Sequence, residues 1–86
     1  QLADGRILCT HASRHYPGSI YATVSRDEGR TWDTDNTRIL AMDLQNVDSC
    51  YPTSGQLADG TILTTWYSNL FAKFYITVLR YRPEDL

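Results

Sequence analysis

The sequence predicts an all-β protein built from two similar antiparallel units, and three observations lead to this prediction. Residues 1–8 recur almost unchanged as residues 56–63, so the chain repeats itself at an interval of 55 residues. Each copy carries an Asp-Gly pair between apolar runs, which is a strong signal for a hairpin turn. The segments between the turns are short, alternate in polarity and are rich in β-branched and aromatic residues. A repeat of this length is typical of the four-stranded blades of a β-propeller.

The first unit, residues 1–48, is predicted to be a complete blade. Residues 1–3 are expected to end its innermost strand, and an Asp-Gly turn follows. A proline and a glycine interrupt the strand pattern within a loop over residues 11–19. The other three strands of this blade are predicted at residues 6–10, 20–24 and 37–42.

The second unit, residues 49–86, is predicted to be an incomplete blade. Its innermost strand can accept Pro52 near its start, where a missing N–H does least harm. A short loop is expected over residues 68–73, and Pro83 ends the last strand. We therefore expect this blade to lack its outermost strand. Its three strands are predicted at residues 51–57, 61–67 and 74–82.

A shaped turn joins the last two strands of the first unit. It carries the pattern Ser-x-Asp-x-Gly-x-Thr-Trp, formed by Ser25, Asp27, Gly29, Thr31 and Trp32. Gly29 can adopt positive φ at no steric cost, and the Asp27 carboxylate can accept hydrogen bonds from N–H groups of its own turn. Trp32 is expected to bury its ring where the chain re-enters the sheet. The pattern thus predicts a structural role for Asp27 and not a catalytic one.

This pattern resembles the Asp box, the bacterial neuraminidase (BNR) repeat of the sialidase superfamily. In that family the box lies between the third and fourth strands of a propeller blade, away from the catalytic face. The resemblance implies a sialidase-type β-propeller whose parent activity is that of a glycosidase acting on sialic acid or related acidic sugars.

A pair of blades is expected to associate with copies of itself. Open strand edges and exposed apolar flanks are unfavourable, so repeat units generally need neighbours. Since the sialidases that the chain resembles have six blades, three two-bladed copies would complete a ring. We therefore expect a homotrimer.

Turns alternate between the two ends of an up-and-down blade. The two Asp-Gly turns and the Asp box are thus expected at one end, and polar and aromatic side chains gather at the other. That group could bind a sugar or a small anion, or it could be an ordinary polar surface. Its members are His11, Arg14, His15, Tyr16, Asp48, Tyr51, Tyr67 and Asn69.

The resemblance also implies catalytic positions. In sialidases the nucleophilic tyrosine begins an innermost strand and an Asp-Gly turn follows eight residues later, as Asp59 follows Tyr51 here. Sialidases are the glycosidases that use a tyrosine nucleophile. Arg14 lies near the position of one of the three arginines that hold the substrate carboxylate in that family. The family's acid/base aspartate and glutamate base have no counterpart, because Glu28 belongs to the Asp box and Glu84 to the tail.

Two functional hypotheses follow. The first is a glycoside hydrolase with Tyr51 as nucleophile and Arg14 as anion ligand. The second is a non-catalytic, self-assembling propeller or carbohydrate-binding module. The missing acid/base groups favour the second, because general acid catalysis typically contributes ~10²–10⁴-fold to the rate.

Other partners are not indicated. The net charge of −2 with no basic cluster argues against nucleic acid and anionic membranes as partners. The sequence shows no signal peptide and no apolar run of 18 residues, so we expect a soluble protein of unknown compartment. No cofactor is indicated, and His11 and His15 lack a third ligand for a metal. Cys9 and Cys50 are expected either to form one disulfide or to be small buried apolar residues.

Overall fold

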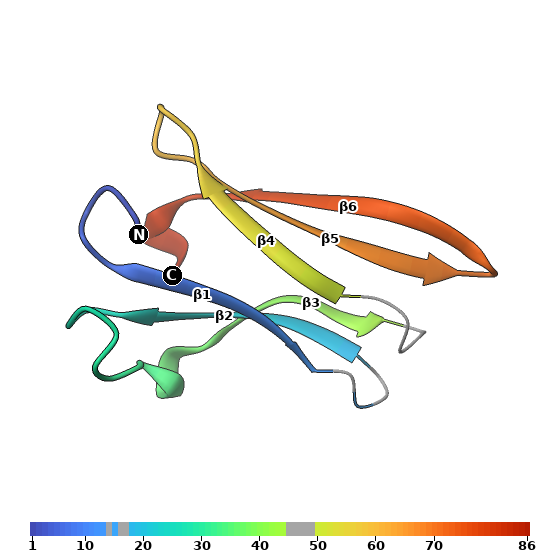
Figure 1. Ribbon diagram of the computed structural model, residues 1–86, viewed down its shortest axis with the longest axis horizontal. Coiled ribbons are helices and arrows are strands. Elements are labelled where there is room, and N and C mark those ends of the chain that lie inside the picture. The colour runs from blue at the N-terminus through green and yellow to red at the C-terminus, as the bar shows by residue number, and fades with distance from the viewer. Residues whose placement is uncertain (14, 16–17, 45–49) are drawn as a thin grey trace.

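The computed structural model describes residues 1–13, 15, 18–44 and 50–86. These residues form two three-stranded antiparallel sheets, which confirms the predicted all-β architecture (Figure 1). The first sheet has the order β1-β2-β3 and contains β1 (Ile7–Ser13), β2 (Gly18–Ser25) and β3 (Arg38–Leu44). The second has the order β4-β5-β6 and contains β4 (Cys50–Gln56), β5 (Ile62–Leu70) and β6 (Lys73–Tyr81). Two 3₁₀ turns, η1 (Thr34–Asn36) and η2 (Pro83–Asp85), complete the described part, and neither is long or apolar enough to cross a membrane.

The two copies of the sequence repeat fold into the same turn. Gly5 and Gly60 have φ values of 94° and 89°, which only glycine adopts without strain. In each copy the glutamine Nε2 donates to the carbonyl of the turn glycine, at 3.0 Å from Gln1 and 2.9 Å from Gln56. The two copies of the repeat therefore share the same glycine conformation and the same hydrogen bond from glutamine to glycine.

The predictions about residues 1–3 and about the loop over residues 68–73 were wrong. Residues 1–3 belong to the first turn and not to a strand, because the Leu2 N–H donates to the Arg6 carbonyl at 2.8 Å. The described part of the chain therefore has six strands where seven were predicted. The loop predicted over residues 68–73 is a two-residue turn at Phe71 and Ala72, because β5 and β6 extend to meet it.

The predicted burial of Trp32 was also wrong. The chain leaves the Asp box through η1 and re-enters the first sheet only at Arg38. Trp32 consequently lies outside the strands, where it is 40% exposed.

The two sheets pack face to face, with β1 beside β4 (Figure 1). A core cluster of Ile20, Cys50 and Trp66 lies between them. A chain of hydroxyl groups crosses the same interface: Thr10 Oγ1 lies 3.0 Å from Ser54 Oγ, which lies 2.8 Å from the buried Thr64 Oγ1. Each sheet thus has an inward face that contacts the other sheet and an outward face that does not.

The turns alternate between the two ends of the strands, as predicted (Figure 1). We call one end the box end, because it holds the Asp box and both Asp-Gly turns. We call the other the hairpin end; there β1, β3 and β5 finish and β2, β4 and β6 begin. This sorting determines which predicted site residues can meet.

Candidate functional site

The Asp box is a closed network of hydrogen bonds. Ser25 Oγ donates to Asp27 Oδ1 at 2.8 Å and accepts from the Gly29 N–H at 2.8 Å. Thr31 donates its N–H to Asp27 Oδ1 at 2.8 Å and its hydroxyl to Asp27 Oδ2 at 2.5 Å. The Thr31 hydroxyl, the Thr31 N–H and the Ser25 hydroxyl together lower the pKa of Asp27 to about 2. The carboxylate is used within its own turn, which fits the structural role predicted for it.

Tyr51 lies at the hairpin end on a strained stretch of backbone. Cys50 and Tyr51 have φ values of 112° and 51°, in a region that side chains larger than glycine rarely occupy. The pairing of β4 with β5 also shifts register between Cys50 and Thr53. Cys50 is buried in the core while the Tyr51 ring is 68% exposed on the outward face of the second sheet. Strain of this kind concentrates at functional sites.

Tyr51, Tyr67 and Phe74 form an aromatic row across the outward face of β4, β5 and β6. The ring centroids of Tyr51 and Tyr67 are 5.8 Å apart and the planes are 19° from parallel. Phe74 lies next to Tyr67, with centroids 6.3 Å apart and an angle of 41°. These are the separations of interacting aromatic pairs. The row thus combines one stacked pair and one tilted pair of aromatic rings, two of which carry a phenol hydroxyl.

The structure thus brings together two of the predicted site residues, Tyr51 and Tyr67. Phe74 was not predicted, although it pairs with Asn69 across the β5–β6 hairpin. Alternation along β5 from Tyr67 to Asn69 would have indicated a shared face, had the hairpin been recognised. Asn69 Oδ1 is buried and accepts no hydrogen bond from the described residues.

The other predicted residues do not join the row. His11 lies on the outward face of the first sheet, where it stacks on Tyr21 and its Nε2 lies 3.1 Å from Thr23 Oγ1. It is therefore on the opposite side of the molecule from the tyrosines. His15 is exposed in the β1–β2 connection. Arg14, Tyr16 and Asp48 lie outside the described residues.

Both glutamates lie at the wrong end to assist Tyr51. Glu28 belongs to the Asp box and Glu84 to η2, and both segments are at the box end. A phenol needs a nearby base to act as a nucleophile at neutral pH. Neither of these two glutamates lies where it could supply that base.

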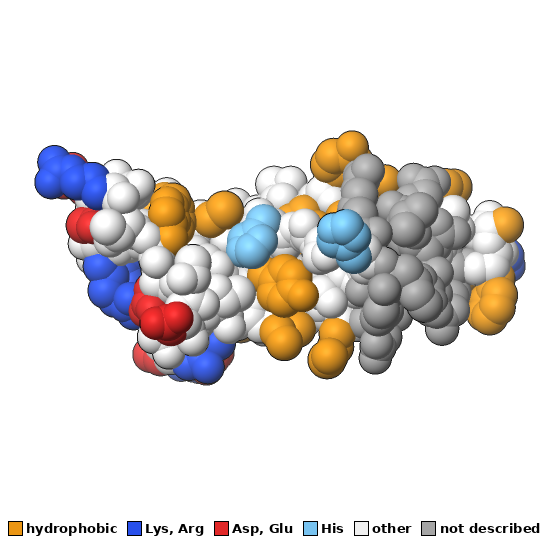
Figure 2. All heavy atoms as spheres, turned by 90° about the horizontal axis from the view of Figure 1, so that it is seen from below, with side chains coloured by type: hydrophobic (Ala, Val, Ile, Leu, Met, Phe, Trp, Pro, Cys, Tyr) orange, Lys and Arg blue, Asp and Glu red, His pale blue; other side chains and the backbone are white. Residues whose placement is uncertain are grey.

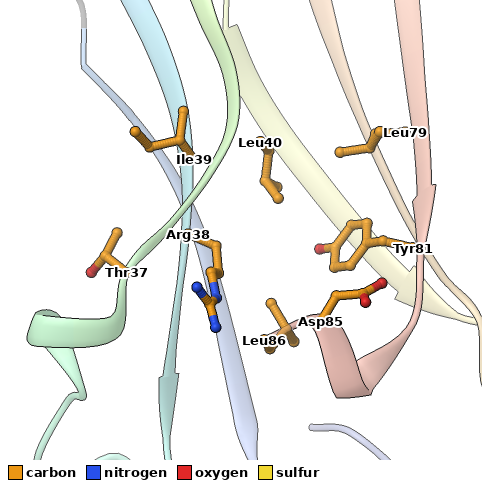
Figure 3. Close-up of a pocket in the computed structure, with 8 residues that line it drawn as sticks. All are labelled: Thr37, Arg38, Ile39, Leu40, Leu79, Tyr81, Asp85 and Leu86. Atoms are coloured by element: carbon orange, nitrogen blue, oxygen red, sulfur yellow. The ribbon is translucent and has the colours of Figure 1, made fainter.

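A separate hollow of about 460 Å³ opens between β3 and β6. Figure 3 shows Leu40, Tyr81 and Leu86 converging on it from the two sides. Asp85 also lines the hollow, but its Oδ2 accepts the Arg82 N–H at 3.0 Å and so closes η2. This hollow lies away from the aromatic row, and its lining residues were not predicted to lie together.

Metal and disulfide chemistry find no support in the described part of the chain. There, no three His, Cys, Asp or Glu side chains group as a metal site. Cys9 is exposed on β1 whereas Cys50 is buried, and no disulfide joins them.

Comparisons with protein-family models, with curated proteins and with solved structures found no match for this chain.

Proposed function

We propose that the chain forms two neighbouring blades of a sialidase-type β-propeller and binds a carbohydrate through the aromatic row. The stack of Tyr51 on Tyr67, at a strained start of β4, is the observation that carries this proposal. The complete Asp box and the resemblance around Tyr51 indicate an acidic sugar, such as a sialic acid, as the ligand class.

The chemistry of the row suits a sugar. A pyranose ring has an apolar C–H face and a polar edge of hydroxyl groups. A phenol combines an apolar ring face with a hydroxyl that both donates and accepts hydrogen bonds. Tyr51 is largely exposed while Tyr67 is half-buried, so Tyr67 supports the ring that contacts the ligand.

The proposed binding is tested by NMR titration of the chain with N-acetylneuraminic acid. Tyr51→Phe keeps the ring and should retain most of the affinity. Tyr51→Ala removes it and should weaken binding about 5–10-fold, since an aromatic contact is worth roughly 1 kcal/mol. Leu57→Ala truncates another exposed hydrophobic residue, at the box end and away from the aromatic row, and serves as the matched control. Equal binding by wild type and Tyr51→Ala would contradict the proposal.

Hydrolysis is the second candidate, because Tyr51 matches the nucleophile position of the family that the chain resembles. A fluorogenic sialoside distinguishes it from binding. We expect no turnover above background from the chain alone. Turnover that Tyr51→Phe abolishes would instead identify Tyr51 as a catalytic residue.

A further inference from the structure

The internal repeat makes the two sheets directly comparable. β1 and β5 are equivalent strands, since Leu8 corresponds to Leu63 and Thr10 to Thr65 at the repeat interval. β2 and β6 are then equivalent through their pairing with these strands. Each position on the first sheet therefore has a counterpart on the second.

The inward face of the first sheet reappears as the outward face of the second. Ile20, which pairs with Ala12, is fully buried against the second sheet. Its counterpart Ile76, which pairs with Tyr67, is 73% exposed. The inward set is Leu8, Thr10, Ala12, Ile20, Ala22 and Val24. The outward set at the same positions is Leu63, Thr65, Tyr67, Ile76, Val78 and Arg80.

A hydrogen bond between the two repeats shows the same difference between equivalent positions. The Ala3 N–H of the first turn donates to Gln56 Oε1 of the second repeat at 2.8 Å. The equivalent donor in the second turn is Ala58 N–H, and the equivalent acceptor in the first is Gln1 Oε1. Among the described residues neither atom has a hydrogen-bond partner. The chain thus forms this hydrogen bond once. It also carries a second, equivalent donor and a second, equivalent acceptor that are not paired with each other.

The matching surface is the outward face of the first sheet, which Figure 2 views from outside. There Ile7, Cys9 and His11 occupy the positions that Ile62, Thr64 and Trp66 occupy on the inward face of the second sheet. Trp32 and Ile39 add exposed apolar surface, at 40% and 56% exposure. In Figure 2 the hydrophobic and histidine side chains lie between the charged box end and the hairpin end.

We propose that the outward face of the second sheet docks the outward face of the first sheet of a second copy of this chain. The contact repeats the one between the two sheets within a chain, with Ala58 N–H donating to Gln1 Oε1 of the second copy. Such a head-to-tail contact forms a ring if its rotation closes. Three copies would then supply six sheets.

This proposal does not depend on carbohydrate binding. It rests on the outward face of β5 and β6 and on the second turn. Tyr67 belongs both to this face and to the aromatic row, whereas Tyr51 lies at the hairpin-end margin of the face. Because docking would cover Tyr67, the sugar titration of Tyr51 variants is run on chains that also carry Ile39→Glu, a change on the first sheet that should keep them single and leave the aromatic row intact. Either proposal can then fail without the other.

The first test is the solution mass by light scattering over a range of concentrations. The wild-type mass should rise above that of one chain and approach three. Ile76→Glu should keep the mass of one chain with an unchanged circular dichroism spectrum, because Ile76 is exposed. Phe71→Glu places the same charge at the β5–β6 turn, beyond the docking face, and should associate like the wild type. A wild-type mass of one chain at every concentration would overturn the proposal.

Mixing two variants tests the head-to-tail arrangement. Ile39→Glu disables the first-sheet face and Ile76→Glu the second-sheet face, so each variant alone should remain a single chain. Their mixture retains one intact pair of faces and should yield a mass of two chains. If Ile39→Glu alone associates like the wild type, the contact does not use the first sheet and the proposal is wrong.

Discussion

Asp27 is the residue for which the structure makes the most specific prediction of a pKa. Hydrogen bonds from Thr31 and Ser25 lower its pKa from 3.8 to about 2 in the folded chain. Because the folded-state pKa lies below the unfolded one, this group stabilises the fold fully only above about pH 4. That stabilisation is lost as the pH falls from about 4 towards about 2. An NMR titration of the Asp27 side-chain carboxyl should therefore show a midpoint near 2.

A substitution at Asp27 tests whether its hydrogen bonds or its charge stabilise the Asp box. Asp27→Asn keeps an acceptor for the Thr31 N–H but removes the second carboxylate oxygen that accepts the Thr31 hydroxyl. We expect its melting temperature at pH 7 to fall by a few degrees and its stability to vary less between pH 2 and 4. Asp35→Asn removes an exposed charge from η1 and should change neither property. Equal effects of the two variants would mean that charge alone, and not the turn network, stabilises the box.

Among the elements, the β5–β6 hairpin has the turn least suited to its conformation. Leu70 pairs with Lys73 across a two-residue turn in which Phe71 and Ala72 have φ values of 52° and 60°. Positive φ at both positions defines a type I′ turn, which favours Asn-Gly. The left-handed region costs a residue other than glycine or asparagine roughly 1–2 kcal/mol.

Replacing Phe71 with Asn and Ala72 with Gly should therefore stabilise the chain. The gain is expected to be about 0.5–1 kcal/mol, because the greater freedom of glycine in the unfolded chain offsets part of the relief. The opposite change, Gly60→Ala, should cost about 1 kcal/mol; its φ is 89° and the added methyl group would meet nothing within 4 Å. Urea unfolding of the three proteins measures both effects. A destabilised Asn-Gly variant would contradict the type I′ assignment.

The same hairpin shows where prediction from sequence succeeds and where it stops. The Asp-Gly turns and the Asp box were predicted because their residues are chosen by turn geometry, at Gly5, Gly60 and Gly29. Phe71 and Ala72 carry no such signal, since pairing of β5 with β6 imposes their conformation. Trp32 was expected to be buried because its ring is apolar, but η1 delays the return to the sheet.

The candidate site was predicted only in part for a related reason. Alternation of the turns correctly placed Tyr51 and Tyr67 at one end of the strands. It could not assign them to a face, because the register shift after Cys50 decides where Tyr51 points. Nor could it separate them from His11, which lies at the same predicted end but on the outward face of the other sheet.

For the whole molecule, the central question is whether the two sheets unfold together. The core joins Ile20 of the first sheet to Cys50 and Trp66 of the second, and the Thr10–Ser54 hydroxyl contact crosses between them. A sheet of three short strands with one face uncovered has little stability of its own. We therefore expect a single cooperative transition in which the contact between the sheets stabilises both.

Ile20→Val tests this cooperativity, since it removes one methylene from a fully buried side chain of the first sheet. The expected cost is about 0.5–1.5 kcal/mol. If the sheets unfold together, the free energy of amide hydrogen exchange should fall equally in β1 and in β5, although the substitution lies in neither. Ile39→Val makes the same change at a position that is 56% exposed in the same sheet, and should alter exchange by less than ~0.5 kcal/mol. Loss of protection confined to β1 and its neighbours would show two independent sheets, in which the contact between them adds little to either.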